Sequence, residues 1–304
     1  MAKRTPSYYP ARGGPSVIMQ ALDKTHPFYP EALRGIPDAP ATLYVRGTLP
    51  ASRPVVAVVG ARAASGHGLA RAHDLAMGLT QGGALVVSGG AVGIDAAAHV
   101  GALDAGGQTV VVLGTGLDAP YPSRHRPLFE RIVAGGGALV SSFQPGVPLR
   151  RWHFPRRNRV LAGLADAVVI VEASPSSGSL YTAQAAREYG RVLCACPGTA
   201  GTEALLSQGV ALVESAADVF AALAGRPRRV EPDAPLVGSD EALALAALDY
   251  ARPRDAGSVA VLAGVAQNRA ARALCALELE GLALSVPGGR YVRAVVADKV
   301  LRGP

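Results

Sequence analysis

The sequence predicts an α/β protein with a doubly wound, mostly parallel sheet, followed by a small helical domain. From residue 54 onward, short β-branched runs alternate with Ala-rich stretches of helical length, a pattern typical of parallel strands joined by helical crossovers. The runs are apolar throughout, as expected for strands that helices cover on both faces. A Pro- and charge-rich stretch at 226–239 then predicts a linker before the smaller domain.

The predicted elements follow one another in a regular order. Six strands are expected, at 54–60, 84–90, 109–116, 138–143, 167–173 and 191–198. Five helices are expected beside them, at 68–83, 91–107, 159–165, 179–190 and 214–225. Ligands of such sheets bind beyond the carboxyl ends of the strands, so we expect the Gly- and Ser-rich turns there to form one amide-rich rim.

The chain therefore divides into a short, Pro-rich N-terminal extension (1–50), the sheet domain (51–225), the linker and a C-terminal domain (240–298). In that last domain, three helical stretches precede two strands around a Pro-Gly-Gly turn, which is a winged-helix outline. The helical stretches lie at 241–251, 258–264 and 268–282.

Composition favours a polyanionic partner. The 304 residues include 30 Lys and Arg against 23 Asp and Glu, a formal charge of +7. No apolar run approaches the ~20 residues of a membrane helix, and the first residues lack the apolar stretch of a signal peptide, so we expect no membrane contact and a cytoplasmic location. Three cysteines make no paired framework; Cys194 and Cys196 alternate along one strand and are expected to be buried and inert.

The first Gly-rich turn runs from Gly60 through Arg62, Ser65 and Gly66 to Gly68. It lacks the GxGxxG spacing of dinucleotide binders and gives little support to NAD or FAD. A Gly-rich turn at a helix N-terminus nevertheless exposes backbone N–H groups to an anion, and an arginine there would add a bidentate phosphate contact. The alternative is that these glycines serve tight packing beside an exposed arginine.

A second motif, SGGAVGIDAAAH, runs from Ser88 to His99 and places Asp95 and His99 on one helix face. An acid–base pair or metal ligands would be one interpretation. Because no third ligand is evident, we favour a structural role in which Asp95 stabilises the helix start through the dipole and His99 makes a local hydrogen bond.

The segment RRWHFPRRNR (150–159) carries five arginines, Trp152 and Phe154. Basic grooves with aromatic rings for base stacking are what proteins use to hold single strands, so this segment predicts such a groove. A solvated basic loop with inward-packed aromatics is the alternative. Asn158 would contact a base edge or cap a helix that starts there, and Ser179, after Gly178, would cap the next helix or help bind phosphate.

These motifs together resemble the DNA-processing protein A (DprA/Smf) family across about residues 27–220. The resemblance rests on VGAR, SGGAVGIDAAAH, GTGLDAPYP, FPRRNRVLAGLADAVVIVEA, SGSLYTAQAAREYGR and PG in that order. The C-terminal ARALCALELEGL and GGRYVRA are similar to the winged-helix tail of many members.

The resemblance implies an extended Rossmann-like fold that binds single-stranded DNA, forms a homodimer, and hands incoming DNA to the RecA recombinase in natural transformation. It implies no catalytic activity, cofactor or metal. The residues expected to bind DNA are Arg62, Ser65, Gly66, Gly90, Arg151, Phe154, Arg157, Asn158, Arg159, Gly178 and Ser179.

The chain departs from the family pattern in three places. Val92 stands where the family usually has a lysine, so more of the binding is expected from 150–159. Glu203 stands where an amide is expected and would repel phosphate, so it is left out of the site. The N-terminal region is also too short for the helical domain that precedes the Rossmann unit in many members.

Two other functions compete with this one. The run PGTAGTE (197–203) is similar to the PGGxGTxxE motif of nucleoside monophosphate phosphoribohydrolases, but its Glu follows Gly-Thr directly, which displaces the carboxylate by roughly half a helical turn. A duplex-binding regulator would read DNA through 268–282, where Arg269 and Arg272 are accompanied by few side chains suited to base edges. We therefore expect the C-terminal domain to contact a protein or stabilise the chain.

Overall fold

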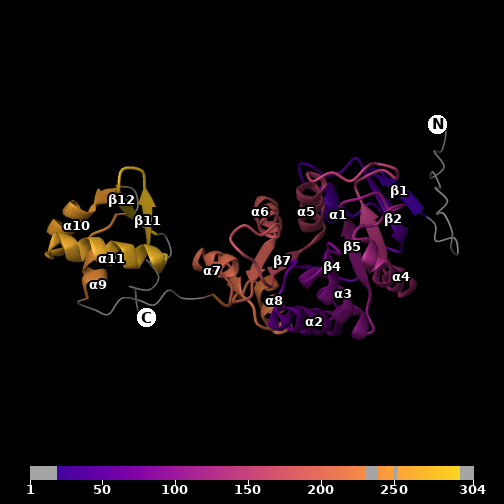
Figure 1. The fold of residues 1–304 in the computed structure, drawn as a ribbon, viewed down its shortest axis with the longest axis horizontal. Helices are drawn as coiled ribbons and strands as arrows, with labels where there is room; N and C mark the ends of the chain where they lie inside the picture. Colours follow the sequence, from indigo (N-terminus) through magenta and orange to yellow (C-terminus); the bar gives the residue numbers. More distant parts are fainter. Residues whose placement is uncertain (1–18, 230–238, 250–251, 295–304) are drawn as a thin grey trace. The chain divides into compact units, whose positions relative to one another are not determined.

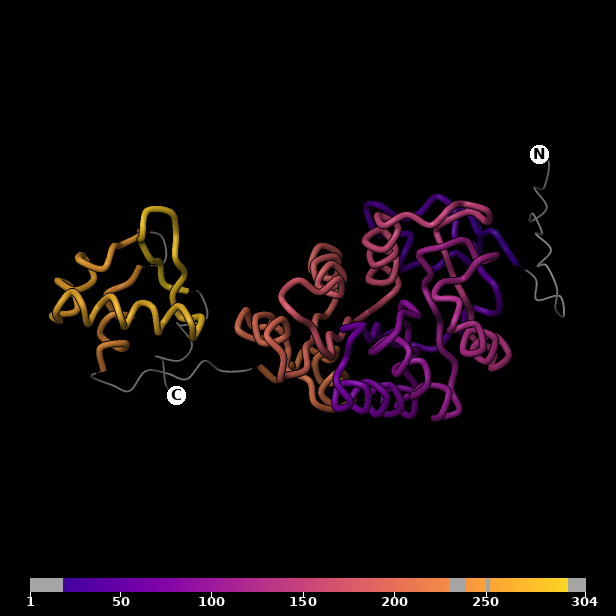
Figure 2. The backbone as a smooth tube through the Cα atoms, viewed as in Figure 1, coloured from indigo at the N-terminus to yellow at the C-terminus, as the bar shows by residue number. Residues whose placement is uncertain are grey.

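A computed structural model describes residues 19–229, 239–249 and 252–294 of the chain. These residues divide into two compact units, one formed mainly by residues before Arg229 and the other mainly by residues after it (Figures 1 and 2). Each unit has its own core. Most of the predicted linker, 230–238, lies outside the described residues, as do 1–18 and 295–298 of the expected end domains.

The larger unit is built on a nine-stranded sheet in the order β1-β2-β6-β5-β4-β3-β7-β8-β9. The strands are β1 (Met19–Asp23), β2 (Thr42–Gly47), β3 (Val55–Val59), β4 (Leu85–Ser88), β5 (Thr109–Leu113), β6 (Ala138–Ser141), β7 (Ala167–Ile170), β8 (Val192–Ala195) and β9 (Ala211–Leu212). From β6 to β9 all neighbours are parallel, whereas β1 and β2 are antiparallel additions. The predicted doubly wound α/β fold is confirmed, and its six predicted strands are β3 to β8.

Helices cover both faces of this sheet (Figure 1). One face carries α2 (Gly66–Gln81), α3 (Ile94–Asp104), α4 (Arg126–Ala134) and α8 (Ala216–Leu223), and the other carries α1 (Glu31–Arg34), α5 (His153–Leu164) and α6 (Leu180–Glu188). A short 3-10 turn, η1 (Ser123–His125), precedes α4, and α7 (Ala200–Ser207) follows β8. Alternate strand residues are fully buried on each face, so the sheet is the core of the unit.

Cys194 and Cys196 lie on one face of β8 and the turn that follows it, in the core that α2 and α8 cover. Burial raises the pKa of both thiols to about 12, which keeps them protonated at neutral pH. The prediction that these cysteines are buried is confirmed.

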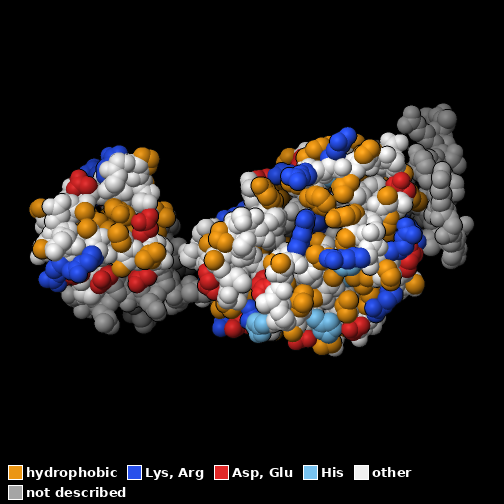
Figure 3. Space-filling view, in the orientation of Figure 1, with side chains coloured by type: hydrophobic (Ala, Val, Ile, Leu, Met, Phe, Trp, Pro, Cys, Tyr) orange, Lys and Arg blue, Asp and Glu red, His pale blue; other side chains and the backbone are white. Residues whose placement is uncertain are grey.

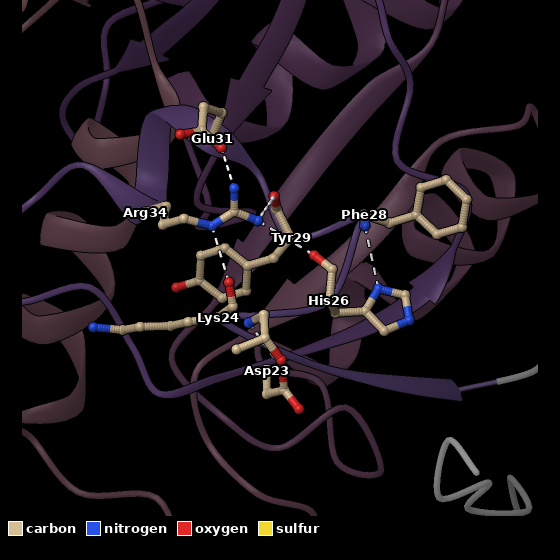
Figure 4. A network of polar contacts seen from close by, with 8 residues as sticks. Asp23, Lys24, His26, Phe28, Tyr29, Glu31 and Arg34 are labelled. Carbon is tan, nitrogen blue, oxygen red and sulfur yellow. Dashed lines mark hydrogen bonds and ion pairs between the residues drawn. The ribbon is translucent and has the colours of Figure 1, made fainter. Parts of the chain in front are cut away.

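The N-terminal part of the chain is integrated into the sheet, where the sequence indicated only an extension. Its two strands, β1 and β2, continue the sheet beyond β6, and the connection between them is held by Arg34. The Arg34 guanidinium donates to the carbonyl oxygens of Lys24, His26 and Tyr29 and pairs with Glu31 (Figure 4). Short strands without strong alternation gave no periodic signal, which is why they were not predicted.

The smaller unit contains three helices and a three-stranded antiparallel sheet in the order β10-β12-β11. Its elements are α9 (Asp240–Ala246), β10 (Arg254–Asp255), α10 (Ala256–Ala263), α11 (Gln267–Leu279), β11 (Ala283–Val286) and β12 (Arg290–Arg293). Gly288 and Gly289 both have positive φ, which the tight turn between β11 and β12 requires. Three helices followed by a hairpin match the predicted winged-helix outline. In the described parts of both units, no helix has the length and apolarity needed to cross a membrane.

His99 is buried in α3 between that helix and the sheet. Its Nδ1 lies 2.9 Å from Thr109 Oγ1, whose hydroxyl donates to the Val86 carbonyl, so the imidazole donates at Nδ1. Nε2 is buried without a partner among the described residues. Burial, and then the nearby charges of His125 and Arg157, lower the pKa of His99 to about 3. The predicted local hydrogen bond of His99 is confirmed.

His99 should make the protein less stable in mild acid. Its unfolded pKa is about 6.5, so the unfolded chain takes up a proton that the native state excludes, and roughly 2 kcal/mol of unfolding free energy is lost between pH 7 and pH 5. His99→Gln should lower stability at pH 7 but flatten this dependence. Urea unfolding of the unchanged protein and of His99→Gln at the two pH values measures this dependence. Equal losses of unfolding free energy in the two proteins would contradict the view that His99 causes it.

Candidate nucleic-acid interface

A large cavity of the unit lies where the strand order reverses, at the carboxyl ends of β3 and β7. It has a volume of about 860 Å³, and its walls come from the turn after β3, the start of α3, the first turn of α5, the loop 172–182 and the start of α7. Ligands of doubly wound sheets bind at such a switch point, because the loops leaving the two strands diverge there. Of the Gly- and Ser-rich turns expected to form one rim, those after β3 and β7 line this cavity.

A second cavity of about 320 Å³ adjoins the first. The two cavities share Arg62, Ala91, Phe154 and Arg157 in their walls, so together they form one continuous crevice. We refer to this pair of cavities as the crevice. Figure 3 shows that Lys and Arg side chains gather on one face of the larger unit.

Arg62 and Phe154 form the ridge between the two cavities. The Arg62 guanidinium carbon lies 5.1 Å from the centre of the Phe154 ring, and Arg62 is exposed. Tyr121 stands on the other side of Phe154, with ring centres 6.1 Å apart and planes tilted by 58°, and 49% of Tyr121 is exposed. A guanidinium and two accessible rings thus converge in one place, which is the combination that stacks and neutralises a single strand.

Arg157 lies beneath this ridge and is almost entirely buried, with 5% of its surface exposed. Its guanidinium pairs with Asp95 of α3 at 3.7 Å. It also packs against Gly89, where an added Cβ would lie 1.1 Å from the Arg157 Nη1, so only glycine fits there. Burial lowers the pKa of Arg157, while Asp95 opposes the shift. Arg157 is a fixed charge in the crevice wall, and Asp95 is its counter-ion as well as a residue of the first turn of α3.

The N-terminus of α2 corrects the expectation for Ser65 and Gly66. Ser65 caps the helix by accepting from the Gly68 amide, but its own amide and hydroxyl both donate to the carboxylate of Glu172, at 2.9 and 2.5 Å. Gly66 is exposed and, among the described residues, does not belong to the crevice wall. The donors expected for a phosphate are therefore bound to a carboxylate of the protein itself, which the sequence did not reveal.

Asn158, Gly178 and Ser179 all line the larger cavity, but their bonds differ from those expected. Because α5 begins at His153, Asn158 lies inside the helix and cannot cap it; its side-chain amide donates to the Gly178 carbonyl at 3.0 Å. Ser179 stands at the N-cap position of α6, yet its hydroxyl lies 2.7 Å from Ser177 Oγ and makes no capping bond within the described residues. These contacts hold the loop against α5.

Three expected residues lie elsewhere in the described structure. Arg159 pairs with Asp38 and, at 2.7 Å, with Glu188, because residues 157 and 159 point about 200° apart on a helix. Gly90 has a φ of +67°, and an added Cβ would lie 2.6 Å from Val111, so it shapes the turn and not the wall. Arg151 is exposed just before α5, outside the crevice wall.

Sequence reasoning missed Glu172, Gly89 and Tyr121. Glu172 directly follows an apolar strand, and Tyr121 stands in a motif of the family resemblance, so both positions carried a signal. Val92 lines the smaller cavity in place of the family's lysine. The Glu203 carboxylate accepts from the Gly198 amide at 2.7 Å and lies outside the described crevice wall, so the carboxylate that a phosphoribohydrolase would need is not presented there.

The chain is similar to known proteins over most of its length. The sequence model of the family described as DNA recombination-mediator protein A matches residues 20–224. Protein Smf of Escherichia coli (strain K12) is 38% identical over 293 residues, which cover 90% of this chain and 77% of that protein. DNA processing protein DprA of Streptococcus pneumoniae is 41% identical over 200 residues, or 64% of this chain and 70% of that protein.

Two solved structures resemble the chain as well. The X-ray structure of DprA from Streptococcus pneumoniae has a TM-score of 0.61 and 38% identity, covering 66% of this chain and 73% of that one. DNA processing protein A from Helicobacter pylori, whose structure is described in terms of its single-stranded DNA binding mode, has a TM-score of 0.60 and 26% identity, covering 69% and 97%.

The Arg157–Asp95 pair should matter for stability. Arg157→Ala leaves Asp95 buried without a counter-ion, and breaking a buried pair in this way costs about 3–5 kcal/mol of unfolding free energy. The double change Asp95→Asn with Arg157→Met should recover much of that loss. Urea unfolding gives these values. The control is Arg131→Ala, which breaks an exposed ion pair with Asp104 and should change the unfolding free energy by less than about 1 kcal/mol. A loss in Arg157→Ala no larger than in the control would refute the buried pairing.

Proposed function

The chain belongs to the DNA recombination-mediator protein A family, and we propose on that premise that it binds single-stranded DNA along the crevice. The relatives named DprA and Smf, together with the Helicobacter pylori protein described by its single-stranded DNA binding mode, support this function. The observation that carries the proposal for this chain is the ridge of Arg62 and Phe154 between two connected cavities.

The ridge favours single strands because a ring can stack only on a base that is not already stacked, and Tyr121 is exposed while Phe154 is half-buried. A base of a single strand can lie flat on Phe154 or Tyr121, whereas the bases of a duplex are already stacked on one another. Arg62 would then meet a phosphate or a base face, and the buried Arg157–Asp95 pair would hold the wall beside it. Asn158 and Gly178 are proposed to hold the wall that the strand follows.

The strand bound in this way is proposed to be handed to RecA in natural transformation and recombination. We further propose that the chain works as a homodimer and performs no catalysis. The position of Glu203, bonded to the Gly198 amide, supports a binding role over cleavage of nucleoside monophosphates. RecA-catalysed strand exchange on DNA precoated with a single-strand binding protein measures the handover, and sedimentation equilibrium measures the dimer.

Arg62→Ala and Phe154→Ala should weaken binding to oligo-dT in different ways. Removing Arg62 loses a phosphate contact, so the slope of log K against log salt should decrease by about 0.7. Removing Phe154 loses a stacking surface worth about 1–3 kcal/mol and should leave that slope unchanged. Fluorescence anisotropy over a series of salt concentrations separates the two effects.

Arg131→Ala is the matched control for these variants, because Arg131 is an exposed arginine of the same unit outside the crevice wall as described. Its affinity and salt slope should equal those of the unchanged protein. If Arg62→Ala and Phe154→Ala both bind oligo-dT like this control, the crevice is not the binding site. Thermal melting confirms that each variant is folded.

The crevice residues all precede residue 201, which leads to a test of the two-domain organisation. We propose that 51–225 is the DNA-binding domain, with β1 and β2 completing its sheet, and that the domain at 240–298 contacts a protein or stabilises the chain. A chain ending at residue 231 should therefore bind oligo-dT within about two-fold of the full chain, since no phosphate contact of the crevice is removed. Loss of binding in a folded truncated chain would place part of the site after the linker.

A further inference from the structure

We propose that Glu172 determines which phosphates the crevice accepts. Its carboxylate occupies the anion site at the N-terminus of α2, so the crevice excludes the terminal phosphate of free nucleotides and remains open to the phosphodiesters of a strand. This inference rests on the proposed binding of single-stranded DNA and names a specificity-determining residue for it.

The contacts of Glu172 show how the anion site is filled. The Ser65 amide donates to Glu172 Oε2 at 2.9 Å, and the Ser65 hydroxyl donates to Oε1 at 2.5 Å. Ser65 Oγ in turn accepts from the Gly68 amide at 2.9 Å. Two donors that would meet an oxyanion at a helix N-terminus are therefore bound to a carboxylate, and a third group of the turn is used for capping.

Two glycines leave the space that Glu172 needs, one beside its carboxylate and one beside its backbone carbonyl. An added Cβ at Gly68 would lie 2.4 Å from Glu172 Oε2, and one at Gly60 would lie 2.8 Å from the Glu172 carbonyl oxygen. That carbonyl accepts from the Ala61 amide at 2.8 Å, which ties the end of β7 to the end of β3. The position of Glu172 is thus fixed by the turn that a nucleotide-binding protein of this fold would give to phosphate.

The charges of the crevice are consequently divided between its two sides. Glu172 places a negative charge at the α2 side, where a phosphomonoester would bring up to two more. Arg62 is exposed beside Phe154 and lines both cavities, whereas Arg157 is buried in the same wall and paired with Asp95. A strand can place its phosphates near the ridge and its bases against the rings, whereas a mononucleotide has no comparable way to avoid the carboxylate.

The test measures phosphate binding directly, without DNA. Glu172→Gln removes the negative charge and keeps the shape of the side chain, whereas Glu172→Ala removes the charge and the shape. The matched control is Glu188→Gln, which removes a carboxylate that pairs with Arg159 at 2.7 Å. Isothermal titration with inorganic phosphate and with thymidine 5′-monophosphate should give no saturable binding in the unchanged protein and the control. Glu172→Ala should bind both saturably, and Glu172→Gln should bind them more weakly than Glu172→Ala, because the helix terminus becomes free for an anion.

Two outcomes would overturn the proposal: a folded Glu172→Ala that binds phosphate no better than Glu188→Gln, or an unchanged protein that already binds thymidine monophosphate as tightly as Glu172→Ala. Thermal melting establishes folding, since Glu172 also holds the α2 turn. Oligo-dT binding is measured in parallel on the unchanged protein. If it fails while the phosphate result holds, the proposed function is wrong and the role of Glu172 as a phosphate barrier stands, so the two failures are distinguishable.

Discussion

The reversal of strand order at β3 is the constraint on which the site depends. Because β4, β5 and β6 lie on one side of β3 and β7, β8 and β9 on the other, the loops that leave β3 and β7 diverge and a cavity opens between them. The same reversal brings the start of α5 to this cavity, so that Phe154 and Arg157 join a wall whose other residues come both from earlier turns (59–65, 91 and 95) and from later ones (172–182, 199 and 200).

In and around that cavity, several charged side chains are paired with other groups of the protein. Asp95 is the counter-ion of Arg157, Asp38 and Glu188 bind Arg159, and Glu172 occupies the start of α2. Two of the five arginines in 150–159, Arg157 and Arg159, are therefore paired within the protein, whereas the other three are exposed. Arg62, exposed beside Phe154, is the cation best placed to meet a ligand.

This distribution of charge suits the proposed binding of single strands. Affinity that came mainly from many exposed arginines would depend steeply on salt and would extend to any polyanion. Aromatic stacking with few exposed cations instead favours unpaired bases, and it tolerates any sequence because every base has a face to stack. A recombination mediator needs that combination, since incoming strands differ in sequence.

The sequence by itself determined the α/β fold, the six inner strands, the buried cysteines and the family, because these depend on local periodicity and on motifs that are contiguous in the chain. It also predicted that Arg62 and Phe154 belong to one site, and both line the crevice. It could not determine which way each arginine of 150–159 points, because that depends on where α5 begins, two turns before the expected start. Nor could it show that Glu172 meets Ser65, since those residues are 107 positions apart and only the pairing of β3 with β7 brings them together. The tertiary structure decided the site because its charges are paired across distant segments.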